Sequence, residues 1–226
     1  MPYKVISLGG SIIIPKDGFD IQFLKKFKKM ILAEIKKGQK FIFVVGGGTT
    51  ARNYQNALKS VEKIDNNELD WMGIAGTRIN AEFVRILFGD LAYKEVLNNP
   101  TKKIKNNKQI IIFSGWKPGW STDYVSVLAA ETFGAKEVIN ASNIDYVYTA
   151  DPKKDSDAKP LKKITWAEMK KIVGDKWNPG ANIPFDPIAT KKAQKLGLKV
   201  FFVKGTELNK FKQVINGVEK VGTIIQ

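Results

Sequence analysis

Two glycine clusters in this chain of 226 residues have the composition of anion-binding loops. They are Leu8–Ser11, "LGGS", and Val44–Arg52, "VVGGGTTAR", and each follows a short apolar run. Backbone without side chains can approach phosphate oxygens closely, and successive N–H groups form a concave site for an anion. Arg52 falls one turn into the helix expected after the second cluster, where its guanidinium would reach a phosphate at the helix start. Neither cluster fits a Walker A or G-x-G-x-x-G pattern, and each alone is equally typical of a tight turn.

A third loop, "FSGWKPGWSTD", occupies Phe113–Asp123 and joins an apolar run to an expected helix. Ser121, Thr122 and Asp123 are typical residues at a helix N-terminus, and capping would explain them without any ligand. The alternative is that Thr122 and the neighbouring amides hold a phosphate or a ribose. The two tryptophans of this loop, four residues apart, are not explained by capping.

Two later segments carry further candidate groups. Asn143–Asp155, "NIDYVYTADPKKD", sets Tyr148 near Asp151, an aromatic face and a carboxylate that would suit a nucleoside base and ribose. Taken alone, these local features favour an ordinary loop. In "DPIATKKA", Lys191 lies one turn into an expected helix, where an ammonium group could neutralise charge on a transferring phosphoryl group. Most lysines on helices are simply solvated.

The chain has no cysteine and no histidine. Disulfides, thiolate or imidazole metal sites and the Ser-His-Asp triad are therefore excluded. A reaction must use carboxylates, lysine, arginine, hydroxyls and backbone amides. Phosphoryl transfer to an acceptor that is already anionic fits this set, because positioning and charge neutralisation supply most of the catalysis and no acceptor proton has to be removed.

The formal net charge is +15. A basic protein can bind nucleic acid or steer small anionic substrates, but the lysine excess can equally be a solvated surface. Lysine pairs such as Lys25-Lys26 and Lys28-Lys29 fall within an apolar-periodic helix and are expected mostly on its outer side. No nucleic-acid recognition motif is present, so we do not expect nucleic acid as a partner. No run of about 18 apolar residues is present either, so we do not expect a membrane as a partner.

These candidate residues must be positioned by alternating strands and helices. Apolar runs that end in glycine or serine predict strands within 3–10, 40–48, 109–115, 136–142 and 199–205, and "GTIIQ" predicts a short final strand within 222–226. Helical periodicity predicts helices within 23–38, 49–64, 67–89, 122–135, 165–174, 186–197 and 207–216. The segment 91–108 is expected to be a connection and 151–164 a loop.

Repeated strand–glycine–helix units predict an α/β fold, a three-layer αβα sandwich with a mainly parallel central sheet. In such folds the carboxyl ends of the strands and the N-termini of the helices meet at one edge, which is where ligands bind. All the glycine loops above belong to that edge. We expect a single domain over residues 1–226, and a cytoplasmic protein, because no signal peptide or membrane-spanning run is present.

In this order the motifs resemble the amino acid kinase superfamily, and most closely its archaeal-type UMP kinases. The motifs are "VVGGGTTAR", "GIAGTRINA" (Gly73–Ala81), "GWKPGWSTD", "NIDYVYTADPKKD" and "DPIATK", and they extend over almost the full chain. The resemblance implies the amino acid kinase fold and transfer of the γ-phosphoryl group of ATP to UMP, giving UDP and ADP in pyrimidine nucleotide biosynthesis. It also implies Mg²⁺ carried by ATP without dedicated protein ligands, and a homohexamer built as a trimer of dimers.

The resemblance assigns roles to specific positions. The N-terminal part, about 1–135, would mainly form the UMP site, and about 136–226 mainly the ATP site. The implied catalytic residues are Arg52, Lys191 and Gly10. The implied UMP-binding residues are Gly47, Asp70, Thr77, Arg78, Trp116, Lys117, Pro118, Gly119, Trp120, Ser121 and Thr122. The implied ATP-binding residues are Gly9, Gly10, Ser11, Gly48, Arg52, Ser142, Asn143, Tyr148 and Asp151.

Some positions depart from the family pattern. Ser7 and Thr49 stand where many members carry lysine, Tyr146 stands where glycine is usual, and the tryptophans of the third loop replace polar residues. We expect at least one of these tryptophans to pack near the UMP site or a subunit contact. Two alternatives remain open: a kinase of another small phosphate or carboxylate, and a nucleotide-sensing protein with weakened catalysis. An isopentenyl phosphate kinase is disfavoured, because that branch uses a histidine.

Overall fold

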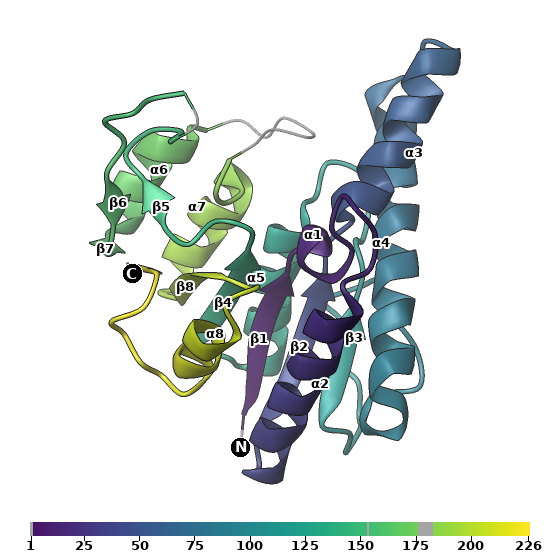
Figure 1. The fold of residues 1–226 in the computed structure, drawn as a ribbon, viewed down its shortest axis with the longest axis vertical. Helices are drawn as coiled ribbons and strands as arrows, with labels where there is room; N and C mark the ends of the chain where they lie inside the picture. Colours follow the sequence, from purple (N-terminus) through teal and green to yellow (C-terminus); the bar gives the residue numbers. More distant parts are fainter. Residues whose placement is uncertain (1, 153, 176–182) are drawn as a thin grey trace.

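The computed structural model describes residues 2–152, 154–175 and 183–226, and within them a seven-stranded sheet forms the centre of the molecule (Figure 1). The strand order is β3-β2-β1-β4-β8-β9-β7. Neighbouring strands pair in parallel except β8 and β9, which are antiparallel. The strands are β1 (Tyr3–Leu8), β2 (Lys40–Val45), β3 (Ile110–Phe113), β4 (Glu137–Ser142), β7 (Lys163–Ile164), β8 (Lys199–Lys204) and β9 (Thr223–Ile225). A separate antiparallel pair joins β5 (Val147–Tyr148) to β6 (Pro160–Leu161).

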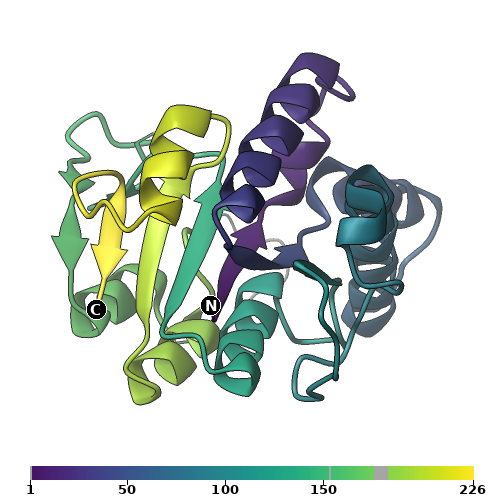
Figure 2. The same cartoon turned by 90° about the horizontal axis from the view of Figure 1, so that it is seen from below.

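Helices cover both faces of the sheet, as Figure 2 shows. Apolar side chains of α1, α2, α4 and α8 pack on one face and those of α5, α6 and α7 on the other. The helices are α1 (Gly10–Ile13), α2 (Ile21–Lys36), α3 (Gly48–Val61), α4 (Asn66–Phe88), α5 (Thr122–Phe133), α6 (Trp166–Val173), α7 (Pro187–Lys195) and α8 (Leu208–Ile215). Alternate residues of β2 pack against the helices on opposite faces of the sheet: Phe43 packs on the side of α2 and α4, and Val44 on the side of α5. The predicted three-layer, mainly parallel architecture is confirmed.

Local sequence signals set the ends of the helices that reach the functional edge. Ser121 caps α5, its hydroxyl accepting a hydrogen bond from the Tyr124 amide at 3.1 Å, and α5 ends at Gly134 in the left-handed region. Asp186 caps α7 and Pro187 occupies its first turn, as the sequence predicted. Because α5 and α7 both start at the carboxyl edge of the sheet, the capping side chains of Ser121 and Asp186 belong to the same region.

Several short elements escaped sequence prediction. Helix α1 forms within the first glycine loop, and β6 and β7 lie within the segment 151–164 that we expected to be a loop. That expectation was wrong because isolated two-residue strands carry no periodicity, whereas hydrogen bonds such as Thr149 amide to Lys159 carbonyl, 3.0 Å, organise the segment. The segment 91–108 also bridges to β3, through Ala92–Ile110 and Leu97–Phe113. Among the described residues, no helix has the length and apolar character needed to cross a bilayer.

Candidate active site

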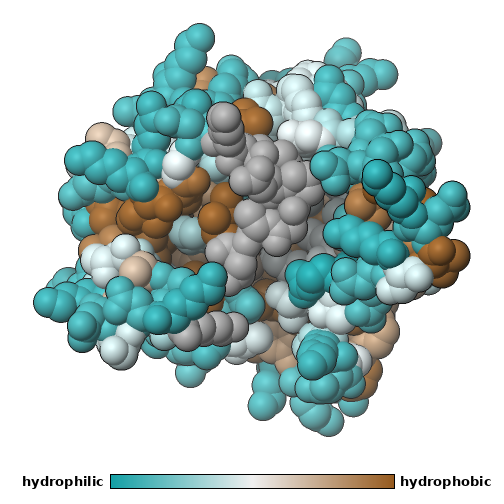
Figure 3. Space-filling model, turned by 90° about the horizontal axis from the view of Figure 1, so that it is seen from above, coloured by the Kyte–Doolittle hydropathy of each residue, from teal (hydrophilic) through white to brown (hydrophobic). Residues whose placement is uncertain are grey.

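A cavity of about 530 Å³ lies where the carboxyl ends of the N-terminal strands meet the starts of α1, α3 and α5. Figure 3 views the molecule from above and shows a mainly hydrophilic margin around this face, with hydrophobic residues further in. Most of the lining belongs to residues predicted for the site or to their direct neighbours. The lining residues are Ser11, Gly47, Gly48, Ala51, Arg52, Gln55, Asp70, Gly73, Ile74, Thr77, Gly115, Lys117, Trp120, Ser121, Thr122 and Asn143.

The first two glycine loops cross in direct backbone contact. A Cβ atom on Gly10 would lie 2.3 Å from the Gly46 carbonyl oxygen and 2.5 Å from the Gly48 nitrogen. A Cβ atom on Gly48 would lie 2.4 Å from the carbonyl carbon of Gly10, and Gly48 has a φ of +53°. No side chain fits at such a crossing, so the glycines are needed for the loops to meet. Their amides are thereby gathered at one edge of the cavity.

Asn80 of α4 holds the second glycine loop in place. Its side-chain amide donates to the carbonyl oxygens of Gly46 and Gly47, both at 2.9 Å, and its own oxygen accepts from the Thr50 hydroxyl at 2.9 Å. Asn80 is fully buried. Our sequence reasoning did not assign it a role, although it lies within the quoted "GIAGTRINA" motif.

Helix α3 points its N-terminus at the cavity. Gly47 is its N-cap and has no side chain to occupy the first amides, which leaves them available to an anion. Arg52 follows one turn later, lines the cavity and is exposed, with a long contact of 3.4 Å from its Nη2 to the Thr49 hydroxyl. The helix start and this guanidinium together make a site for a phosphate.

The third loop is fastened to α4 by two hydrogen bonds. The Gly119 amide donates to Asp70 Oδ2 at 2.8 Å, and the Gly115 amide donates to the Thr77 hydroxyl at 2.7 Å. Thr77 in turn donates to the Ile74 carbonyl at 2.6 Å. Asp70 and Thr77, both assigned to the acceptor, therefore line the cavity and also position the loop that closes it.

Beneath the glycine crossing lies a group of polar residues from four elements. Asp123 Oδ1 accepts from the Ser7 hydroxyl at 3.0 Å and from the Asn140 amide at 3.2 Å. Burial, and then the charge of Asp186, raise the pKa of Asp123 to about 7, against the lowering effect of its hydrogen bond from Ser7. Asp186 is buried and caps α7 through Oδ1, whereas its buried Oδ2 has no hydrogen-bond partner among the described residues. Ser7 thus donates to a carboxylate, Asp123, that is itself close to the carboxylate of Asp186.

The residues assigned to ATP are less concentrated. The cavity lining includes four of them: Ser11, Gly48, Arg52 and Asn143. Three others are within two residues of these in the sequence but do not line the cavity: Gly9, Gly10 and Ser142. Tyr148 donates to Asp145 at 2.8 Å, and this hydrogen bond raises the pKa of Tyr148. Lys191 forms an ion pair with Asp175 at 3.1 Å, which lowers the pKa of Asp175. Neither Tyr148, Asp151 nor Lys191 belongs to the cavity lining.

The structure places Arg78 away from the cavity. It is exposed on α4 and lines a different recess with Ile79, Glu82 and Lys94. Consecutive helical residues point about 100° apart, so Arg78 and the buried Thr77 cannot face the same side. Trp116, Pro118 and Gly119 belong to the third loop but do not line the cavity themselves.

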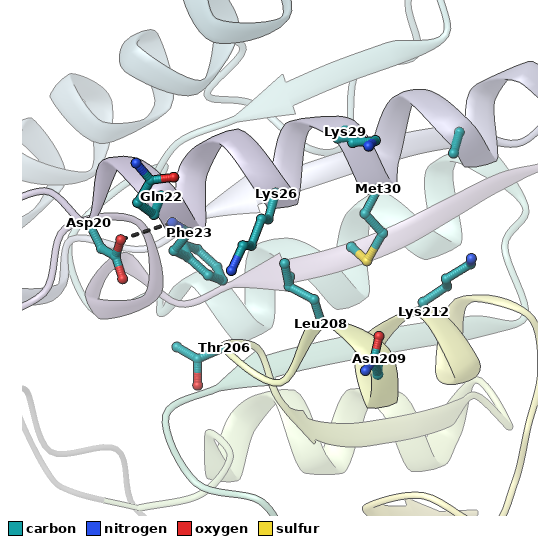
Figure 4. Close-up of a pocket in the computed structure, with 11 residues that line it drawn as sticks. Asp20, Gln22, Phe23, Lys26, Lys29, Met30, Thr206, Leu208, Asn209 and Lys212 are labelled. Carbon is teal, nitrogen blue, oxygen red and sulfur yellow. Dashed lines mark hydrogen bonds between the residues drawn. The ribbon is translucent and has the colours of Figure 1, made fainter.

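A larger recess, of about 710 Å³, lies between α2 and α8 (Figure 4). Lys26, Lys29 and Lys212 surround it, with Phe23 and Met30 among its apolar residues. It contains none of the predicted site residues and no glycine loop. The cavity at the sheet edge therefore remains the candidate active site.

Comparison with known proteins agrees with this geometry. Residues 2–204 match the model of the amino acid kinase family. The chain belongs to this family. It is 35% identical to a uridylate kinase from Methanococcus vannielii, over 98% of both chains, and 33% identical to a uridylate kinase from Pyrococcus abyssi, over 97% of this chain and 98% of the relative. The crystal structure of uridylate kinase from Archaeoglobus fulgidus superimposes with a TM-score of 0.83 at 29% identity, over 100% of both chains.

Proposed function

We propose that this protein is a UMP kinase, which transfers the γ-phosphoryl group of ATP to UMP to give UDP and ADP. The observation that carries the proposal is the cavity itself, in which the glycine crossing, Arg52 and Asp70 converge on one space. The near full-length similarity to uridylate kinases supports the same acceptor. The activity belongs to pyrimidine nucleotide biosynthesis.

Within this cavity the phosphate of UMP binds at the start of α3, where the free amides and Arg52 neutralise its charge. Asp70 accepts hydrogen bonds from the ribose hydroxyls. ATP approaches over Gly9–Ser11 and Asn143, and enters as its Mg²⁺ complex. The acceptor oxygen is already anionic, so the protein contributes alignment and charge stabilisation rather than a general base.

The charge that builds up on the transferring phosphoryl group needs cations near it. Arg52, which follows the start of α3, is the cationic side chain that the described cavity lining offers at this position. We propose that Lys191 joins it by leaving Asp175 when ATP binds, since an exposed ion pair of this kind is weak. Ser7 cannot supply the charge of the lysine that many relatives have at its position.

We also propose that the protein forms a homo-oligomer, a hexamer built from dimers. Its support in the structure is an apolar stripe on the outer side of α4, where Trp71, Ile79 and Ile86 are 47%, 55% and 64% exposed. Exposed apolar side chains in such a row are typical of a protein contact. We place the protein in the cytoplasm, with no nucleic acid as partner.

The second candidate is a nucleotide sensor of the same fold. Two observations favour it: Ser7 replaces a lysine, and Lys191 is engaged by Asp175. Such a protein would bind UMP in the same cavity without transferring phosphate at a useful rate.

One experiment decides between these candidates. Purified protein receives Mg·ATP with UMP, CMP, AMP, GMP, TMP or isopentenyl phosphate in parallel, and nucleotide binding is measured calorimetrically alongside. Formation of UDP, with UMP as the preferred acceptor, supports the kinase. Binding of UMP without turnover supports the sensor, and preference for another acceptor would contradict the proposal.

A further inference from the structure

Lys117 is held between two indole rings at the edge of the candidate active site. Its ammonium nitrogen lies 4.4 Å from the ring centroids of both Trp116 and Trp120. The two rings meet edge to face at 4.9 Å, and Trp120 contacts Tyr124 in the same manner at 4.5 Å. Two simultaneous cation–π contacts fix a side chain that is otherwise among the most flexible. Lys117 and Trp120 line the cavity, whereas Trp116 supports Lys117 from outside the lining.

The cavity extends along α4, from the glycine loop to Asp70. Helices α3 and α4 pack side by side. Asn80 binds the glycine loop, and Gly76 lies against Ala51. Further along, the side-chain amide of Gln55 donates to the Leu69 carbonyl. Following α4 from Asn80 back to Asp70 covers ten residues, or about 15 Å. The third loop follows α4 over this distance: its Gly115 amide binds Thr77, one turn from Asn80, and its Gly119 amide binds Asp70 at the far end.

Electrostatics assigns the two ends to different parts of the acceptor. The α3 start and Arg52 attract a phosphate, whereas the Asp70 carboxylate would repel one. The uncharged parts of the acceptor therefore occupy the Asp70 end. There the ribose reaches Asp70, and the base lies against the third loop, where the Trp120 ring offers a flat apolar surface.

A lysine ammonium has three N–H donors and no acceptor. Uracil presents carbonyl oxygens on its pairing edge, whereas cytosine replaces one of them with an amino group that can only donate. A fixed donor beside the base would bond uracil and would face an amino group of cytosine without a partner. We propose that the Lys117 ammonium recognises the carbonyl edge of the acceptor base and selects UMP over CMP. This inference rests on the proposed UMP kinase function.

The two tryptophans have distinct roles in this arrangement. Trp120 contacts the base and Lys117, whereas Trp116 is a positioning residue that acts through Lys117. They stand where some relatives carry polar residues, and in this chain they form an aromatic cage around a single donor.

The test measures kcat/KM for UMP and for CMP in the wild-type protein, in Lys117→Met and in Lys103→Met. Methionine keeps a long apolar side chain but removes the donors, and Lys103 is an exposed lysine outside the cavity lining. We expect Lys117→Met to lower kcat/KM for UMP about 10- to 100-fold and to change the value for CMP less than about threefold. The Lys103→Met control should leave both unchanged.

An equal loss for UMP and CMP in Lys117→Met would overturn the proposal, because it would place Lys117 at the phosphate. If Lys117→Met leaves kcat/KM unchanged for both nucleotides, the proposal is overturned as well. If Lys117→Met does not fold, Lys117→Gln serves instead: its carbonyl can accept from cytosine, so the ratio should fall and the rate with CMP should rise. Trp116 is tested in the same way. A positioning role is supported if Trp116→Leu lowers the ratio of kcat/KM for UMP to that for CMP and Trp116→Phe restores it.

Failure of the inference is separable from failure of the proposed function. If the wild-type protein phosphorylates no nucleotide, the kinase proposal fails. Dissociation constants for UMP and CMP, measured by calorimetry on the same variants, then test Lys117 without any reference to catalysis. UMP bound more tightly than CMP in the wild-type protein, and equally in Lys117→Met, supports the inference in that case. Equal affinities in the wild-type protein reject it.

Discussion

The part of this edge that we propose for the acceptor (the acceptor side) and the part that we propose for ATP (the donor side) are built in different ways. On the acceptor side, Asn80, Thr77 and Asp70 lie on one face of the long helix α4 and each fastens a loop that borders the cavity. On the donor side, Tyr148 and Lys191 bind acidic residues nearby, Asp145 and Asp175, and neither belongs to the cavity lining that the described residues form. A site that rests on one rigid helix is formed before its ligand arrives. A site made of loop residues with local partners requires the ligand to gather them.

The glycine crossing carries the largest expected effect on the acceptor side. Gly10→Ala would drive a Cβ atom into backbone at 2.3 Å, and backbone cannot move aside as a side chain does. We expect a loss of about 3 kcal/mol of unfolding free energy, measured by urea denaturation.

The matched control is Gly18→Ala. Gly18 has a φ of +99°, but a Cβ atom added there would meet no neighbouring side chain or backbone within 4 Å, so only the backbone penalty of about 1 kcal/mol applies. Equal losses in the two variants would mean that the two loops separate readily and that the crossing does not build the site.

Arg52 tests whether the start of α3 is the phosphate position. Because a guanidinium contact to a transferring phosphoryl or acceptor phosphate acts on the transition state, Arg52→Ala should lower kcat/KM for UMP by about 10²- to 10³-fold. Stability should hardly change, since Arg52 is exposed. Arg85→Ala is the control, because Arg85 pairs with Glu82 elsewhere on α4. A rate with Arg52→Ala as high as with Arg85→Ala would remove Arg52 from the site.

Much of this edge follows from sequence, because each glycine loop comes directly after a buried strand and before a helix. A glycine between a strand and a helix is a local signal, and such signals predicted β1 to β4, α3 and α5. What could not be predicted depends on contacts between distant segments. The crossing of Gly10 with Gly48, the anchoring role of Asn80 and the outward direction of Arg78 all require knowing how α4 is rotated against the sheet.

The carboxylates at the boundary of the two sides make the stability depend on pH. Ser7 and Asp123 come from the acceptor side, and Asn140 and Asp186 from the donor side. The pKa of Asp123 is about 7 in the folded protein and 3.8 without the fold, so between these values folding retains a proton that the unfolded chain releases. Stability from this group is therefore full at low pH and is lost as the pH rises toward 7, at about 1.4 kcal/mol per pH unit.

Asp123→Asn should remove that slope. Unfolding free energies of the wild-type protein and of Asp123→Asn, measured across this pH range, should differ most in their pH dependence, with Asp17→Asn as an exposed control. If the two curves run parallel, Asp123 does not hold the proton. Ser7→Lys should also flatten the slope, because an ammonium group would pair with the carboxylates and lower the pKa of Asp123.

The smallest expected effect concerns Lys191, and it bears most directly on the contrast between the two sides. If the donor side assembles only around ATP, Lys191 exchanges Asp175 for phosphate, and Lys191→Met should lower kcat about tenfold with little change in KM for UMP. Asp175→Asn releases the same lysine without removing it, and should leave kcat within about twofold, because an exposed pair contributes little. Equal kcat losses in both variants would instead mean that the ion pair itself supports the site, and the donor side would then be as preformed as the acceptor side.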